Sequence, residues 1–131
     1  MDTKKELLNA ICRNNLHPFI IKIFELLENA ADYQDNWHIK CMAWHLQKCV
    51  TGNSKRLIIA VCPRYLKSYC ATVALPIWIL GRNPTARIIC VSYSDELALH
   101  FSRMRRTALE NKFIQTLFPK LRLSKRKNSE R

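Results

Sequence analysis

The chain has 131 residues, enough for one small domain, and 48% of them are hydrophobic, so a real core is possible. Its 22 lysines and arginines outnumber its 10 acidic residues and give a formal net charge of +12. This charge indicates a polyanionic partner, such as nucleic acid, nucleotide or an acidic surface, with a merely basic surface as the alternative. The polar start does not resemble a secretory signal, and no apolar run reaches the roughly 18 residues of a membrane helix. We therefore expect a cytoplasmic protein.

The N-terminal part of the chain, residues 1–54, is predicted to be helical. Leu7, Leu8 and Ile11 share one face of a short helix over residues 3–12. Pro18 suits the first turn of a second helix. A third helix is predicted from Trp37 to Val50, with Gly52 following its end.

The pattern changes after residue 54, where two continuous apolar runs, 56–62 and 86–92, are typical of strands buried on both faces. A helix over residues 67–80, kinked at Pro76, is predicted between them, and a helix from Ser94 to about Glu110 after them. A shorter helix is expected over 113–118. This order predicts an α/β fold, an incomplete parallel sheet of the P-loop NTPase type behind a helical N-terminal region. The core would span residues 55–118, followed by a basic tail over 119–131.

A candidate phosphate-binding loop joins the first predicted strand to the next helix, with the sequence Cys62-Pro63-Arg64-Tyr65-Leu66-Lys67-Ser68. In such loops the lysine, here Lys67, reaches the β- and γ-phosphates, and the hydroxyl of Ser68 would bind Mg²⁺. The two glycines of the usual pattern are absent, because Val61 and Leu66 hold their positions. The loop by itself is therefore a weak signal.

The residues around the loop add a more specific signal. Residues 73–84 hold a proline and a tryptophan before a Leu-Gly-Arg-Asn-Pro turn, and residues 92–98 read Ser-Tyr-Ser-Asp-Glu-Leu-Ala. Further landmarks are Trp37-His38 upstream of the loop and Leu117-Phe118-Pro119 downstream of it. The order of these segments along the chain resembles the large terminase subunit of tailed bacteriophages, over roughly residues 33–129.

The resemblance implies the ATPase portion of a viral DNA-packaging motor in a bacterial host cell. It implies that ATP and Mg²⁺ are bound by Pro63, Arg64, Tyr65, Leu66, Lys67 and Ser68. Arg64 would contact the γ-phosphate as a catalytic group, and Trp37 and His38 would lie where the family recognises adenine. The implied partners are double-stranded DNA, the portal and the small terminase subunit.

A second catalytic group, the acid that holds Mg²⁺ for phosphoryl transfer, is not evident in the sequence. Asp95 and Glu96 follow a predicted strand, but Ser92, Tyr93 and Ser94 intervene, so we interpret the pair as the acidic first turn of a helix. In the family this acid and the nuclease come later, so the chain is expected to be truncated and inactive alone. The alternatives are a basic nucleic-acid-binding or assembly module without ATP turnover, and a small P-loop kinase.

Three further groups of residues have simpler interpretations. His38, Cys41, His45 and Cys49 share a helix face, but its ends are about 16 Å apart, so helix packing is favoured over zinc. The six cysteines are expected to be reduced, buried thiols, and the larger aromatic residues to be core: Phe19, Phe24, Trp44, Trp78 and Phe118. The densest basic region predicts either DNA phosphate contacts or a solvated surface: Arg103, Arg105, Arg106, Lys120, Arg122, Lys125, Arg126, Lys127 and Arg131.

Overall fold

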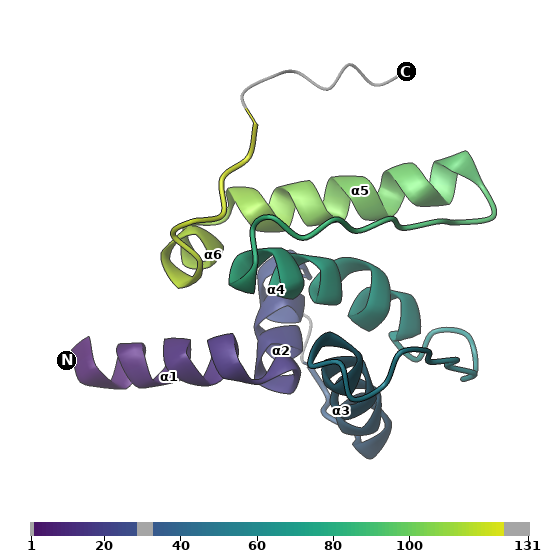
Figure 1. The fold of residues 1–131 in the computed structure, drawn as a ribbon, viewed down its shortest axis with the longest axis horizontal. Helices are drawn as coiled ribbons and strands as arrows, with labels where there is room; N and C mark the ends of the chain where they lie inside the picture. Colours follow the sequence, from purple (N-terminus) through teal and green to yellow (C-terminus); the bar gives the residue numbers. More distant parts are fainter. Residues whose placement is uncertain (1, 29–32, 125–131) are drawn as a thin grey trace.

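The computed structural model describes residues 2–28 and 33–124, and within these ranges its regular elements are helices (Figure 1). The elements are α1 (Asp2–Asn14), α2 (Leu16–Leu27), α3 (Trp37–Val50), the π-helix η1 (Tyr69–Ala74), α4 (Leu75–Arg82), α5 (Asp95–Glu110) and α6 (Lys112–Leu117). Each helix predicted from the sequence is therefore present, with ends that differ by a few residues. Part of the expected basic tail, residues 125–131, lies outside the described residues.

The predicted parallel sheet is wrong. Residues 56–62 and 86–92 are extended, but in the part of the chain that the structure describes they form no strand ladder, and the fold is all-helical. The runs were predicted to be strands buried on both faces, but Ile58 is 94% exposed and Ile89 is 89% exposed. A strand also needs a neighbouring strand to receive its hydrogen bonds. Neither segment has one, so helices alone build the fold.

The core is centred on α2, which contacts α1, α3, α4, η1 and α5. Its buried side chains Leu16, Phe19, Ile20 and Ile23 recur at helical spacing, so one face of α2 enters the core. The largest fully buried side chain, Trp78 of α4, donates its indole N–H to the carbonyl oxygen of Cys12 at 3.0 Å. Because this hydrogen bond pairs the indole's one donor, the burial of Trp78 leaves no polar group without a partner.

The break between α1 and α2 is held by Gln47 from α3. Its side-chain oxygen accepts from the backbone N–H of Leu16 at 3.0 Å, and its Nε2 donates to the carbonyl of Asn14 at 3.1 Å. Close to this break in the sequence, Arg13 of α1 donates to the carbonyl of Leu117 at 2.7 Å, where α6 ends. Side chains thus satisfy backbone groups that helix ends leave without partners.

The helix that follows the candidate phosphate loop is irregular at its centre. Pro76 has no N–H, so it gives no α-helical hydrogen bond to the carbonyl of Thr72 four residues earlier. Arg105 of α5 donates to that carbonyl at 2.8 Å. The adjoining residues form η1, in which the N–H of Leu75 bonds to Cys70, five residues back. The kink predicted at Pro76 therefore appears as a π-helical segment braced by α5.

The predicted aromatic core is confirmed in part. Phe19, Trp78 and Phe118 are buried and Phe24 packs against the core, but the side chain of Trp44 is 56% exposed, with Lys48 3.5 Å from its ring centroid.

The six cysteines are free, as expected, but the prediction that they are buried is wrong for half of them. Cys12 and Cys70 are buried, Cys49 is half-buried, and the exposed ones are Cys41, Cys62 and Cys90.

Candidate functional site

The candidate phosphate loop contains two residues with left-handed backbone conformation. Arg64 has φ 70° and Leu66 has φ 59°, and among the described residues they are the non-glycine positions with positive φ. For a side chain such as leucine this conformation is rare and costs about 1–2 kcal/mol. Leu66 occupies the position where the usual phosphate loop has glycine, so the backbone adopts there a conformation that glycine accepts freely.

Helical hydrogen bonding starts immediately after this turn, where the N–H of Cys70 bonds to the carbonyl of Leu66 at 2.9 Å. Lys67 and Ser68 therefore lie in the first helical turn, Lys67 half-buried and Ser68 exposed. The first N–H groups of a helix have no acceptor within it and carry a partial positive charge. The loop thus leads into a helix start that also carries a lysine and a hydroxyl.

A cavity of about 240 Å³ lies between this loop and the start of α3. The loop contributes Arg64, Tyr65 and Leu66 to its wall, and the opposite wall includes Asp35 and His38. The rings of His38 and Tyr65 meet edge to face with centroids 5.3 Å apart. Two regions separated by more than twenty residues, both named by the resemblance, are therefore in contact.

The remaining residues of the predicted site lie around this cavity without lining it. Trp37 is 75% exposed, its ring edge to face with that of His38 at 6.3 Å. Pro63, Lys67 and Ser68 belong to the same loop and helix start but are not part of the cavity wall.

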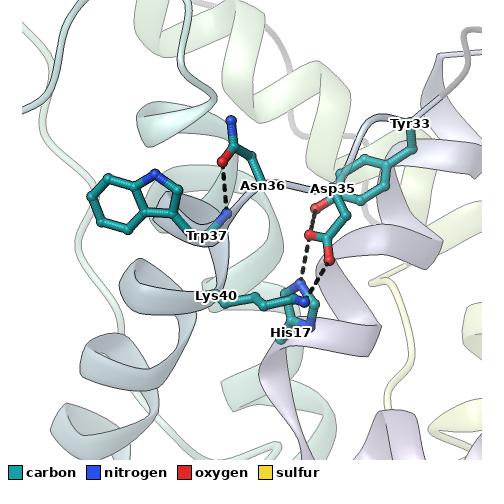
Figure 2. Close-up of polar contacts among 6 residues, drawn as sticks. All are labelled: His17, Tyr33, Asp35, Asn36, Trp37 and Lys40. Carbon is teal, nitrogen blue, oxygen red and sulfur yellow. Dashed lines mark hydrogen bonds and ion pairs between the residues drawn. The ribbon is translucent and has the colours of Figure 1, made fainter.

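One wall of the cavity is fixed by a network centred on Asp35 (Figure 2). One carboxylate oxygen accepts from Tyr33 and pairs with Nε2 of His17, both at 3.0 Å, and the other is 3.2 Å from Nζ of Lys40. Partial burial would raise the pKa of Asp35, but the hydrogen bonds from His17, Lys40 and Tyr33 lower it to about 2. The carboxylate therefore stays ionised and holds the chain before α3 against α2.

The start of α3 is set by the next residue. The side chain of Asn36 accepts from the backbone N–H of Trp37 at 2.8 Å. Figure 2 shows Trp37 directed away from the Asp35 carboxylate, on the other side of Asn36. Together Asp35 and Asn36 determine where the Trp37-His38 pair begins its helix.

The Asp35 network is the part of the site that sequence reasoning missed. An asparagine before an apolar helix is a recognisable cap, so Asn36 had a signal. His17 and Asp35 are 18 positions apart and meet only because α2 packs against α3. No local pattern predicts such a contact.

On and before α5, several residues that the sequence offered as candidate catalytic or DNA-binding groups have partners within the protein. Ser94 accepts from the N–H of Leu97 at 3.2 Å, so Asp95 and Glu96 form the first turn of α5, which confirms the capping interpretation. On α5, Arg105 binds the carbonyl of Thr72 and Arg106 pairs with Glu110 at 3.3 Å.

The side chains considered for zinc do not form a metal site. Within residues 2–28 and 33–124, no group of three or more potential ligands is close enough to hold a metal ion. The alternative of helix packing is also wrong for Cys41 and His45, which are exposed.

Comparison of the chain with protein-family models, with curated proteins and with solved structures gave no match. Among the described helices, none is both long and apolar enough to cross a membrane.

Proposed function

We propose that this chain binds the phosphates of a nucleotide through the loop Pro63–Ser68, as a nucleotide-binding segment of the kind found in phage terminase large subunits. The observation that carries the proposal is the loop itself. Two residues of its turn, Arg64 and Leu66, adopt the left-handed conformation, and helical bonding begins at once, with Lys67 in the first turn. Strained backbone held at such a place is typical of a functional loop.

The charges around the loop suit a polyphosphate. Lys67 and the first-turn amides supply positive charge and donors at the helix start, and the guanidinium of Arg64 can bind phosphate oxygens in a bidentate manner. Asp35 is the carboxylate in the cavity wall; Lys40 already offsets its charge, and His17 is hydrogen-bonded to it. A bound phosphate would therefore meet little repulsion there.

Magnesium would arrive with the nucleotide, and the loop offers it one ligand, the hydroxyl of Ser68. Mg²⁺ prefers six oxygen ligands and usually keeps several waters. One protein hydroxyl plus phosphate oxygens and water fits that preference. Because Asp35, the carboxylate in the cavity wall, already has partners in its own network, we propose nucleotide binding by this chain and not turnover by it alone.

His38 and Trp37 are proposed to contact the base. The His38 ring already lies against Tyr65 of the loop, and Trp37 is an exposed aromatic surface beside it. The rings of Trp37 and His38 stand at 87° to each other, so a purine would stack on one of them beside the cavity that the loop lines.

The proposal is tested by titrating the protein with Mg·ATP. Lys67→Ala should weaken binding by roughly tenfold or more, because it removes the lysine charge at the helix start. Lys112→Ala is the matched control, since it removes an equal charge from an exposed position at the start of α6. Equal affinities for wild type and Lys67→Ala would refute the phosphate loop.

The contact with the base is tested by comparing ATP with inorganic triphosphate. Trp37→Ala should weaken binding of ATP while leaving binding of triphosphate unchanged. If both ligands lose affinity equally, the site recognises phosphate alone.

Double-stranded DNA is a second candidate ligand, favoured by the net charge of +12. Binding to DNA phosphates would weaken steeply with salt. Such binding should survive Lys67→Ala, because it would rest on many cations and not on the loop. If Lys67→Ala leaves Mg·ATP binding unchanged while DNA binding is strong and salt-sensitive, the chain is a basic nucleic-acid-binding module.

A further inference from the structure

A second hollow lies on the other side of His38, between α3 and the extended segment 57–61. Its volume is about 310 Å³. Trp37, Cys41 and His45 of α3 form one wall, and residues 57–61 form the other. The groove borders the nucleotide cavity at His38, but it contains none of the loop residues.

The segment along this groove is apolar on both faces. Leu57, Ile59 and Val61 pack against the core, while the alternate residues face outward. Ile58 is 94% exposed although its side chain is as apolar as those packed inward. An alternating extended segment normally exposes polar residues on its outer face. The exposed outer face of this segment is apolar instead, as expected of a surface that a binding partner covers.

The backbone N–H and C=O groups of the segment also lack hydrogen-bond partners among the described residues. Among the described residues, no hydrogen bond of the protein involves the backbone of residues 57–62. Extended backbone with open donors and acceptors is a template on which another extended chain can pair. An apolar outer face, a groove and an open backbone edge thus occur together at one place.

We propose that this groove binds an extended segment of a partner protein, which pairs with the backbone of residues 57–61 and carries acidic residues at its ends. The charge of the groove selects this occupant. Exposed Arg56 directly precedes the segment, and exposed Arg64 lies three residues after Val61 in the sequence, so a cation flanks the segment on each side along the chain. A second copy of the chain would bring the same arginines and a further net charge of +12, which opposes self-pairing.

The experiment uses a synthetic peptide of about eight residues that alternates valine with threonine and carries a glutamate at each end. Binding is measured by titration, and the site by amide hydrogen exchange of the protein. We expect the peptide to slow exchange at residues 57–61. Methylating alternate peptide nitrogens should weaken binding about tenfold, because it removes the backbone hydrogen bonds to the segment. Replacing the terminal glutamates by lysines should weaken binding by a similar factor, because it removes the charge attraction to the arginines.

Two protein variants separate specific pairing from general stickiness. Ile58→Asp should weaken binding about tenfold, and its fold should survive because Ile58 makes little contact in the native structure. Ile89→Asp is the matched control, since Ile89 is 89% exposed on the other extended segment and does not line the groove. Lys67→Ala should leave peptide binding unchanged, because Lys67 does not line the groove, so this variant distinguishes loss of nucleotide binding from loss of peptide binding.

The proposal is overturned if the peptide does not bind, or if the methylated peptide binds as well as the unmodified one. It is also overturned if Ile89→Asp is as harmful as Ile58→Asp. Concentration-dependent dimerisation that itself protects residues 57–61 would instead assign the groove to a second copy.

Discussion

Arg64 and Leu66 are the residues, among those that the structure describes, at which a side-chain-bearing position takes left-handed backbone geometry. Both have positive φ, and neither is glycine. Leu66 packs partly against the core, which helps to hold its conformation, whereas Arg64 is exposed. The strain at Arg64 is therefore the part of the loop that a substitution can release without losing core contacts.

We predict that Arg64→Gly is more stable to unfolding than Arg64→Ala by about 1 kcal/mol, because glycine tolerates positive φ and alanine does not. At His100, an exposed position within α5, the order should reverse, with alanine better by about 1 kcal/mol. Denaturant unfolding of the four variants gives both differences. The same order at both positions would show that residue 64 is not left-handed.

Asp35 links stability to pH in a defined direction. Its pKa is lowered from 3.8 to about 2 in the folded protein. A lowered pKa stabilises the fold above about pH 4, and this stabilisation disappears as the pH falls toward 2. Because the ion pair of Asp35 with Lys40 is partly exposed, we expect Asp35→Asn to lower the free energy of unfolding by about 1 kcal/mol at pH 7.

The difference between Asp35→Asn and wild type should shrink between pH 4 and pH 2, as protonation removes the same charge from wild type. Free energies of unfolding measured across this range test the network. If the stability difference between the variant and wild type does not change with pH, the hydrogen bonds to Asp35 do not lower the pKa of its carboxyl group.

At the scale of elements, the π-helix and α5 depend on each other. Pro76 removes a donor from the helix, and Arg105 supplies one to the carbonyl of Thr72. The sequence indicated a kink at Pro76 but not which group would compensate for it. Arg105 looked like one more cation of a basic region, and only the packing of α5 on η1 reveals its role.

We predict that Arg105→Ala destabilises the protein by about 1–3 kcal/mol, since it leaves a partly buried carbonyl without its charged donor. Arg106→Ala, which removes an exposed pair with Glu110, should cost less than about 0.5 kcal/mol. In a Pro76→Ala background the cost of Arg105→Ala should fall, because alanine restores a backbone donor. Equal costs in both backgrounds would separate Arg105 from the proline.

The helices could be predicted because their signals are local. The cap at Ser94 and the apolar spacing of α2 are readable within one or two turns. The predicted strands failed because pairing is not local. Residues 56–62 have the composition of a buried strand, but within the described chain no other segment pairs with their backbone as a strand would. For the same reason the sequence indicated Lys67 and His38 but not Asp35.

The whole molecule depends on close packing of its C-terminal helices against α2. Gly81 faces the ring of Phe118, which meets the ring of Phe19 edge to face at 5.8 Å. The predicted helix ended at residue 80, before Gly81, but α4 continues to Arg82. Its lack of a side chain instead admits Phe118.

We predict that Gly81→Ala destabilises the protein by about 1–3 kcal/mol, because the added methyl would collide with Phe118. The double variant Gly81→Ala with Phe118→Leu should recover part of this loss. Thermal unfolding of the two variants, beside Phe118→Leu alone, measures the coupling. Additive losses would mean that these residues do not touch.

We propose that the turn at Arg64–Leu66 and the helix start that follows it bind phosphate. Amide hydrogen exchange with and without Mg·ATP tests this most directly, because it reports where the ligand binds. We predict slower exchange at residues 64–69 and at the start of α3, with no such change in Lys67→Ala. Protection confined to α5, or none in any part of the chain, would contradict the claim.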